Sequence, residues 1–244
     1  MKKKILFKYY NFLLQDTYNR TIKHNGFTPC GVCWNNKKSQ YIRFDVLTSL
    51  LKKFSFNTRL KIADVGCGYA ELLNYLIEKN IIFEYEGYDI NKQMINYCKN
   101  KFFNFNFYLN NSPINYCDVS IMSGTYNYAV TDNIESWESY VIHNLSECLK
   151  KSRLGIAFNL QFEKKRNIRN NIYYTNVQYM FDLLKRNFIK IEKLFWIVIK
   201  TVIFSCKTRL KAMLFENTDK VRITRRIKKI IVHRSMNRWI LTSK

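Results

Sequence analysis

The sequence predicts an α/β fold in which a mostly parallel sheet is covered by helices on both faces. Three observations support this prediction. Short apolar runs of strand length alternate with stretches whose apolar residues recur every three or four positions. One of these runs ends in a glycine turn that opens a helical stretch. A length of 244 residues is enough for one substantial core, so a single main domain is expected.

The first predicted elements are a helix, a strand and a second helix. Apolar residues at helical spacing predict an amphipathic helix over residues 41–57. Residues 60–65 form a short apolar run that ends at Gly66 and Gly68, and a helical pattern follows over residues 72–77. This order predicts a strand, a tight turn and a helix.

The alternation continues along the chain. The further predicted strands are residues 83–90, 105–109, 119–123 and 155–160, and the further predicted helices are residues 92–102, 134–149 and 177–184. Residues 188–206 are rich in Ile, Phe, Val and Trp and predict one or two final strands, as an antiparallel hairpin at the sheet edge. Together these elements predict a Rossmann-like, doubly wound sheet of seven strands, mostly parallel with an antiparallel edge strand, and an N-terminal helical lead-in.

Composition divides the chain into three parts. Residues 1–58 are expected to form the helical lead-in or lid, residues 59–206 the sheet domain, and residues 207–244 a basic tail. In the tail, twelve Lys and Arg stand against Glu216 and Asp219. Isoleucines at helical spacing among these basic residues predict a basic amphipathic helix.

The net charge of +23 normally indicates nucleic acid or an anionic surface as partner. However, Lys, Asn, Ile, Tyr and Phe recur everywhere while Gly and Pro number only 7 and 2, which is the bias expected from an A+T-rich genome. The charge alone therefore does not establish such a partner, and nucleic-acid binding through the tail stays an alternative.

Cysteine usage and hydropathy favour a cytoplasmic protein. The 7 cysteines are an odd number without a framework, which favours a reducing compartment. The N-terminus resembles the basic opening of a signal peptide, but Lys8 interrupts its apolar run. The longest apolar stretch, residues 194–204, is broken by Lys200 and is shorter than the roughly 20 residues of a membrane span, so no transmembrane segment is expected.

The glycine turn and a downstream carboxylate predict a binding site for a nucleoside-bearing ligand. Asp64, Gly66 and Gly68 close the first strand, and glycines allow a sharp turn and close approach to a ligand. Asp89 ends the second strand, where a carboxylate can accept both hydroxyls of a ribose. A dinucleotide site is the alternative, but the third glycine of its motif is absent. Asp64 would also repel a pyrophosphate and attract the ammonium of a methionine moiety.

The motif Asp64-Val65-Gly66-Cys67-Gly68-Tyr69 resembles the first motif of class I S-adenosylmethionine-dependent methyltransferases, and Tyr88-Asp89-Ile90 resembles their acidic second motif. A narrower similarity, to a group of uncharacterised bacterial methyltransferases of this class, rests on five further stretches. They are Gly31–Trp34, Ser39-Gln40, Arg43-Phe44, Ser123–Asn127 and Ala157–Leu160. The resemblance covers roughly residues 24–187 and implies S-adenosylmethionine as cofactor.

The resemblance also implies roles for individual residues. Asp64, Gly66 and Gly68 would surround the methionine part, with Cys67 as a small filler inside the turn; Asp89 would hold the ribose, Ile90 one face of the adenine, and Ser123 and Gly124 the pocket floor. Asn111 stands where relatives often carry an aspartate for the adenine amino group, and its amide oxygen can accept that bond. Ala70 stands where many relatives have a third glycine.

Catalysis by methyl transfer needs alignment rather than a nucleophilic side chain. Our hypothesis is that Asn127 orients the acceptor atom; the alternative is that it caps a turn. Trp34, Gln40 and Arg43 are expected either to form a lid or to pack in the core. No metal site is expected, because the pair Cys30 and Cys33 has no partners at ligand spacing.

The predicted function is methyl transfer from S-adenosylmethionine to an unidentified acceptor, a small molecule or a glycan or lipid precursor. Two alternatives remain open at this point. One is an RNA methyltransferase that uses the basic tail, and the other is a non-catalytic protein that binds S-adenosylmethionine.

Overall fold

The computed structural model describes residues 2–49, 59–188, 194–199 and 201–207. Three predictions lie outside the described residues and stay predictions. They are the tail helix, the tail region itself and residues 50–57 of the lead-in helix.

The described elements follow the predicted alternation of helices and strands. The helices are α1 (Lys2–Asn25), α2 (Lys37–Ser49), α3 (Glu71–Glu78), α4 (Lys92–Lys101), α5 (Ile134–Lys151) and α6 (Val177–Asn187), with a short 3-10 helix, η1 (Cys30–Val32). The strands are β1 (Leu60–Val65), β2 (Phe83–Asp89), β3 (Asn106–Leu109), β4 (Cys117–Met122), β5 (Ser152–Phe162), β6 (Asn167–Arg169), β7 (Ile172–Thr175), β8 (Leu194–Ile199) and β9 (Thr201–Lys207).

The strands form one sheet whose seven-stranded core has the predicted arrangement. Strands β3, β2, β1, β4 and β5 lie in that order and pair in parallel. Strand β9 pairs antiparallel with β5, and β8 pairs antiparallel with β9. The predicted doubly wound sheet with an antiparallel hairpin at its edge is therefore confirmed.

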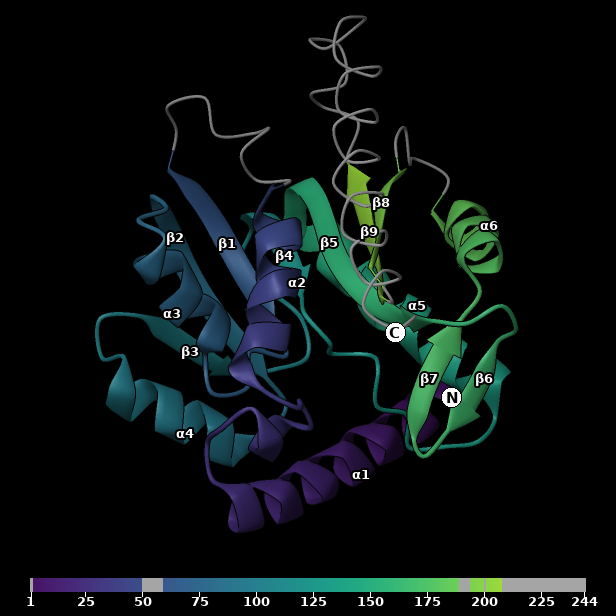
Figure 1. Cartoon of the computed structure of the whole chain (residues 1–244), viewed down its shortest axis with the longest axis horizontal. Coiled ribbons are helices and arrows are strands. Elements are labelled where there is room, and N and C mark those ends of the chain that lie inside the picture. The colour runs from purple at the N-terminus through teal and green to yellow at the C-terminus, as the bar shows by residue number, and fades with distance from the viewer. Residues whose placement is uncertain (1, 50–58, 189–193, 200, 208–244) are drawn as a thin grey trace, which may run out of the picture. The chain divides into compact units, whose positions relative to one another are not determined.

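The strand order reverses between β1 and β4, which are neighbours although two strands separate them in the chain. In an open parallel sheet, the crevice at the carboxyl ends of such strands is where ligands bind. Helix α1 crosses below this end of the sheet, and α3 and α4 lie beside β1, β2 and β3 (Figure 1). The fold thus places a helix over the edge where a ligand is expected.

Side chains alternate between two apolar clusters on opposite faces of the sheet. Along β1, Ile62 joins the cluster formed with α2, α3 and α4, whereas Ala63 and Val65 join the cluster formed with α1, α5 and α6. Trp137 of α5 is fully buried in the second cluster and donates its indole N–H to the carbonyl of Tyr126. Both faces of the sheet are therefore covered, as a mostly parallel sheet requires.

Helix α1 begins within the stretch that resembles a signal-peptide start. Phe7, Tyr10, Leu14, Tyr18 and Ile22 repeat at intervals of three and four residues and are all buried or half-buried. This stripe packs on α5 and on the carboxyl end of the sheet. The same spacing in the sequence is a helix signal, so this part of the lead-in was identifiable in principle.

The hairpin of β6 and β7 was not predicted. It is joined by Asn170 and Asn171, which adopt φ values of 51° and 60°. Two successive residues at positive φ make the turn that favours two-residue hairpins, and asparagine tolerates this backbone conformation. The Asn-Asn pair before the β-prone residues 172–175 was therefore the signal that sequence reading overlooked.

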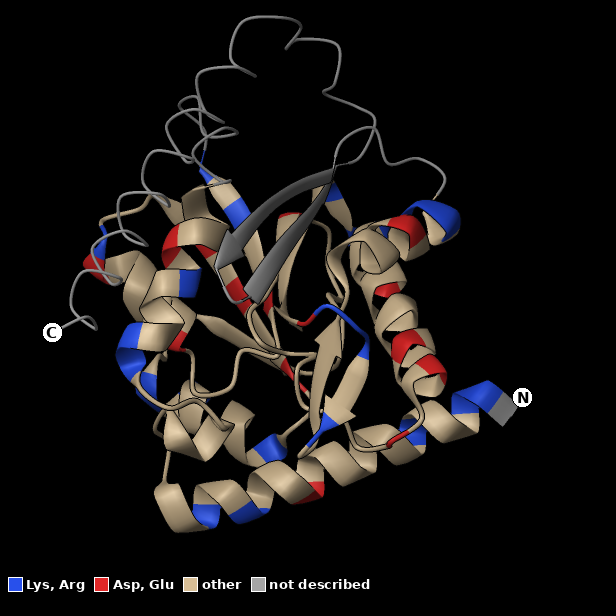
Figure 2. Ribbon diagram, turned by 45° about the vertical axis from the view of Figure 1, so that its right-hand side comes forward, with Lys and Arg blue, Asp and Glu red and all other residues tan. Residues whose placement is uncertain are grey.

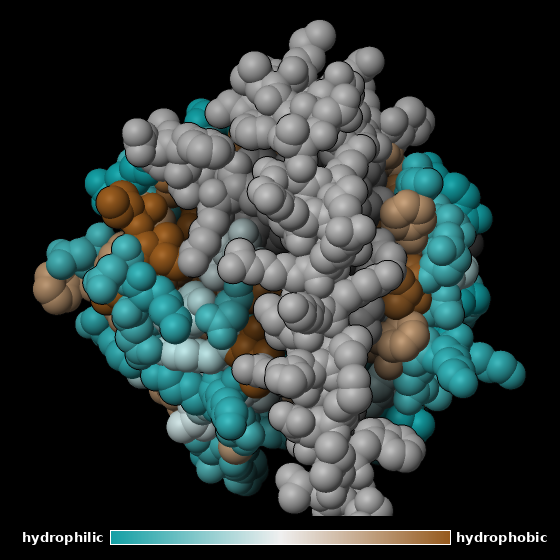
Figure 3. Space-filling model, turned by 45° about the horizontal axis from the view of Figure 1, so that its top comes forward, coloured by the Kyte–Doolittle hydropathy of each residue, from teal (hydrophilic) through white to brown (hydrophobic). Residues whose placement is uncertain are grey.

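The described surface is mostly polar on the face drawn in Figure 3, where hydrophobic residues form small separate patches. In the part of the chain that the structure describes, no helix combines the length and apolar character that crossing a membrane requires.

Candidate functional site

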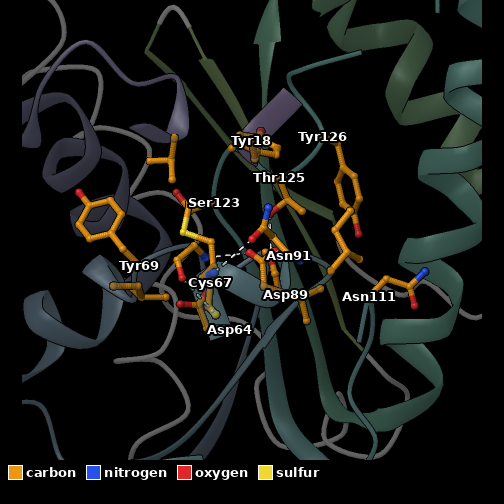
Figure 4. A pocket seen from close by; sticks show the side chains of 18 of the residues that line it. Tyr18, Asp64, Cys67, Tyr69, Asp89, Asn91, Asn111, Ser123, Thr125 and Tyr126 are labelled. Carbon is orange, nitrogen blue, oxygen red and sulfur yellow. Dashed lines mark hydrogen bonds between the residues drawn. The ribbon is translucent and has the colours of Figure 1, made fainter. Parts of the chain in front are cut away.

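A pocket lies at the carboxyl ends of β1, β2 and β4, where the strand order reverses. Residues from four regions line it: the lead-in, the glycine turn, the end of β2 with the start of α4, and the β4 loop with α5. Figure 4 shows Asp64, Asp89, Asn91 and Ser123 gathered around this space. The pocket therefore occupies the place that the sheet topology predicts for a ligand.

Gly66 brings the β1 turn against the loop that follows β4. Its φ is +75°, and a Cβ at this position would stand 2.5 Å from the Thr125 methyl carbon. Thr125 in turn donates its hydroxyl to the carbonyl of Val65 at 2.8 Å. Only glycine combines this conformation with this close approach. Glycine at position 66 therefore allows the end of β1 to contact the loop that follows β4.

Asp89 fixes the second turn residue. Its Oδ2 accepts from the backbone N–H of Gly68 at 2.9 Å, and its Oδ1 accepts from the N–H of Asn91 at 2.8 Å. Burial raises the pKa of Asp89, while the N–H groups of Asn91 and Gly68 act in the opposite direction. Each carboxylate oxygen is able to accept more than one hydrogen bond, so both oxygens of Asp89 can still accept from a ligand hydroxyl.

Asp64 is a buried carboxylate that lines the pocket, with 2% of its surface exposed. The Tyr85 hydroxyl donates to its Oδ2 at 2.7 Å. Burial raises the pKa of Asp64 to about 7, helped by the charge of Asp89 and opposed by the Tyr85 hydrogen bond. A carboxylate held this way is stabilised by any cation that enters the pocket.

Gly124 lines the pocket in the loop that follows β4. A Cβ there would stand 2.6 Å from Cζ2 of Trp34, and its N–H donates to Oδ1 of Asn159 at 2.8 Å. Next to it, the Ser123 hydroxyl is buried and has no hydrogen-bond partner among the described residues. An orphaned hydroxyl in a pocket wall is a group that a polar ligand can satisfy.

The structure brings all the predicted cofactor residues together. The residues that line the pocket include Asp64, Gly66, Cys67, Gly68, Asp89, Ile90, Asn111, Ser123 and Gly124. Sequence reading missed Leu14 and Tyr18 of α1, Asn91 and Met94 at the start of α4, and Tyr140 and Asn144 of α5. The α1 stripe was a usable signal, whereas nothing in the local sequence of α5 indicates that its residues reach this pocket.

Asn127 lies outside the lining of the pocket. Its amide oxygen accepts from the backbone N–H of Gln161 at 3.1 Å, and its carbonyl accepts from the N–H of Tyr173. These bonds connect the β4 loop to the end of β5 and to β7. The geometry supports the alternative of a loop-fixing residue, and a role for Asn127 in orienting the acceptor stays a prediction.

The predicted lid residues divide into two groups. Trp34 and Gln40 line the pocket, and Gln40 accepts a hydrogen bond from Tyr69 at 2.8 Å. The Arg43 guanidinium lies 4.6 Å from the centre of the Trp34 ring and donates to the carbonyl of Ser39. Arg43 therefore supports Trp34 from outside the pocket lining.

Helix α1 is tied to the pocket through Asn91. This residue caps α4 by accepting from the N–H groups of Gln93 and Met94, and its amide N–H donates to Asn19 Oδ1 at 2.9 Å.

Among the described residues, no group of three or more His, Cys, Asp or Glu could hold a metal ion.

Comparisons with known proteins show what the chain is similar to in sequence and in fold. No family model matches it. It is 28% identical over 134 residues to a protein of Mycobacterium tuberculosis named “Putative methyltransferase”, a match that covers 53% of this chain and 81% of the relative. Among solved structures, magnesium protoporphyrin IX methyltransferase from Synechocystis with bound S-adenosylmethionine has a TM-score of 0.53, 15% identity and coverage of 86% and 98%.

Two further solved structures share the fold. A S-adenosylmethionine-dependent methyltransferase of Leishmania major has a TM-score of 0.57 at 12% identity, with coverage of 78% of this chain and 82% of that one. The plantazolicin methyltransferase in complex with S-adenosylhomocysteine has a TM-score of 0.52 at 13% identity, with coverage of 86% and 100%.

The chain therefore has the fold of S-adenosylmethionine-dependent methyltransferases of known structure. It is also similar in sequence to a protein that is named a methyltransferase. The fold that the two sequence motifs imply is thereby confirmed.

Proposed function

We propose that the chain transfers the methyl group of S-adenosylmethionine to a small-molecule acceptor. The observation that carries this proposal is the pocket itself, in which two carboxylates and a glycine turn face residues of the lead-in. Leu14, Tyr18 and Trp34 line the same pocket as Asp64 and Asp89. A covered site of this kind suits a compact acceptor better than a large one.

The residues fit the cofactor on three counts. Gly68 has φ +54° and a Cβ there would meet only Val32 at 3.4 Å, which leaves room beside the turn. Asp64 gains a partner when the methionine ammonium enters, and Asp89 can accept the ribose hydroxyls. Ser123 offers an orphaned hydroxyl to the ligand.

The bound cofactor supplies an activated methyl group on a sulfonium. The chain's own contribution is then to bind, align and exclude water. Leu14, Val32 and Trp34 provide apolar cover from the lead-in. Burial, as the largest cause, raises the pKa of Tyr18, so its phenol stays protonated and acts as a hydrogen-bond donor rather than as a base.

Charge argues against RNA as the acceptor. Among the described residues, those that line the pocket include Asp64, Glu71 and Asp89 but no Lys or Arg. In the described residues, Lys and Arg are spread over the outside of the helices (Figure 2). A polyanion approaching this pocket would meet carboxylates, which repel its phosphates. The small-molecule methyltransferases among the solved structures support the same choice.

We also propose a cytoplasmic location. Cys30 and Cys33 are exposed free thiols close together in the chain, and such thiols persist in a reducing compartment.

Thermal unfolding with and without S-adenosylhomocysteine tests the cofactor part of the proposal, with NADH as the control ligand. At 100 times its dissociation constant, the ligand should stabilise the protein by about 2.7 kcal/mol, or roughly 5–10 °C for a chain of this size. The variant Asp89→Ala should lose this shift relative to its own ligand-free midpoint. The matched control Asp182→Ala, an exposed carboxylate of α6 outside the pocket, should keep it. A shift with NADH alone would contradict the proposal.

A further inference from the structure

Two neutral amides meet at the end of the pocket formed by the β3 loop and α5. Asn111 and Asn144 both line the pocket, and Asn144 is 1% exposed. Asn144 Nδ2 donates to the carbonyl oxygen of Tyr140 at 2.8 Å. A backbone carbonyl can only accept, so the NH₂ group of Asn144 must face it. The amide oxygen of Asn144 therefore points away from the Tyr140 carbonyl.

The orientation of Asn144 sets that of Asn111. Asn111 Nδ2 donates to Oδ1 of Asn144 at 2.9 Å. With its NH₂ group held by Asn144, the amide oxygen of Asn111 points away from Asn144. The Tyr140 carbonyl thus fixes, through two amides in series, which end of the Asn111 amide faces Asn144 and which end is left to accept a hydrogen bond.

We propose that Asn144 is a positioning residue that makes the pocket select a 6-aminopurine over a 6-oxopurine. This inference rests on the proposed function, in which the adenine of the cofactor lies beside Asn111. The adenine amino group donates, so it matches an amide oxygen. A 6-oxo group accepts, so it is matched only by an amide that has rotated to present its NH₂ group. Asn144 prevents that rotation by accepting from the NH₂ group of Asn111.

The two hydrogen bonds from Asn111 to Asn144 and from Asn144 to the Tyr140 carbonyl explain how an asparagine can replace a carboxylate as the acceptor for the adenine amino group. An aspartate has two acceptor oxygens and no donor, so it needs no orientation. Asn111 has one of each, and its selectivity depends on a neighbour that fixes it. The oxygen that Asn144 presents would repel a carboxylate at position 111. Residues 111 and 144 should therefore be coupled.

Calorimetric binding of S-adenosylhomocysteine and of S-inosylhomocysteine, its 6-oxo analogue, tests the inference. The parent chain should prefer S-adenosylhomocysteine by at least about tenfold, because a mismatched buried polar pair costs a hydrogen bond. In Asn144→Leu this preference should fall to within about threefold of unity, since Asn111 can then rotate. Asn115→Leu, the same change at an exposed residue outside the pocket, is the control and should keep the preference.

The double variant Asn111→Asp/Asn144→Leu separates positioning from a structural role. Its carboxylate cannot donate, so the preference should return to at least about tenfold. Asn111→Asp alone should bind more weakly than the double variant, because Asn144 then faces it with an oxygen. If Asn144 only supported the fold, both ligands would weaken equally and the second substitution would restore nothing.

An unchanged preference in Asn144→Leu, or a double variant that does not recover it, would overturn the inference. If the leucine variant fails to fold, Asn144→Ser is used instead, since its short side chain cannot reach Asn111 and the same loss is expected. Binding of neither ligand to the parent chain would overturn the cofactor assignment as well. Tight binding of S-adenosylhomocysteine with an unaltered ratio would overturn only the role of Asn144.

Discussion

The two sides of the pocket use their polar side chains differently. On the β1–β2 side, Asp64 and Asp89 are carboxylates that line the cavity with raised pKa values. On the β4–β5 side, Asn127 and Asn159 are amides whose oxygens accept from the backbone N–H groups of Gln161 and Gly124. One side carries charge for a ligand, and the other uses neutral amides to hold the shape of its own loops.

This difference separates two kinds of defect. We call the β1–β2 side, with Asp64 and Asp89, the carboxylate side, and the β4–β5 side, with Asn127 and Asn159, the amide side. A change on the carboxylate side should alter ligand affinity more than the free energy of unfolding, whereas a change on the amide side should mainly alter the free energy of unfolding. The two sides are in contact at Gly66 and Thr125, where a substitution should lower both the ligand affinity and the free energy of unfolding.

The largest effect is expected at the contact between the sides. Gly66→Ala places a Cβ 2.5 Å from Thr125 at φ +75°, so we expect it to lower the free energy of unfolding by about 3 kcal/mol. Gly68→Ala is the matched control, since it adds strain at φ +54° but meets only Val32 at 3.4 Å, and should cost about 1 kcal/mol. Denaturant unfolding measures both. Equal losses would mean that backbone strain, and not the contact between the strand ends, decides the cost.

The next effect concerns the amide side alone. Asn159 is fully buried and its oxygen accepts from Gly124 N–H at 2.8 Å, so Asn159→Leu leaves that donor unpaired. We expect a loss of about 2 kcal/mol in the free energy of unfolding. The affinity for S-adenosylhomocysteine, measured by calorimetry below the unfolding midpoint, should change less than in Asp89→Ala. A larger binding defect in Asn159→Leu would show that the two sides are not divided in this way.

The carboxylate side should make both folding and binding depend on pH. Because the pKa of Asp64 rises to about 7 in the ligand-free fold, its contribution to stability is complete below about pH 4 and is lost as pH rises to about 7. A ligand ammonium favours the ionised form, so the affinity for S-adenosylhomocysteine should rise up to about tenfold between pH 6 and 8 and then level off. Calorimetry across this range measures it.

Asp64→Asn is the control for the pH effect, because it keeps the size of the side chain and removes its titration. The affinity of this variant should depend less on pH between 6 and 8. Asp89 contributes with the same sign, since its pKa is raised too, so a smaller slope should remain. A slope as steep as that of the parent chain would assign the effect to another group.

How much the sequence predicts also differs between the two sides. The carboxylate side is local: Asp64, Gly66, Gly68 and Asp89 close two strands, and their spacing alone places them at one sheet edge. The amide side depends on long-range contacts. The oxygen of Asn127, for which the sequence left open a role in orienting the acceptor or in capping a turn, accepts from the N–H of Gln161, 34 positions away. Asn144 joins the pocket only because α5 packs beside the end of β3, which no local pattern encodes.

The smallest effect is expected at Ala70, where the chain departs from the glycine of many relatives. Ala70 adopts φ +63° and ψ 38° at the start of α3, a left-handed conformation that glycine occupies without strain. Ala70→Gly should relieve about 1 kcal/mol of this strain and lose part of the packing of a fully buried methyl group, for a net gain of up to about 0.5 kcal/mol. Denaturant unfolding measures the change, with Ala129→Gly, another buried alanine, as a control that should only destabilise. Because Ala70 does not line the pocket, the affinity for S-adenosylhomocysteine should stay within about twofold. A loss of stability as large as in the control would mean that packing, and not backbone strain, is why this chain keeps alanine there.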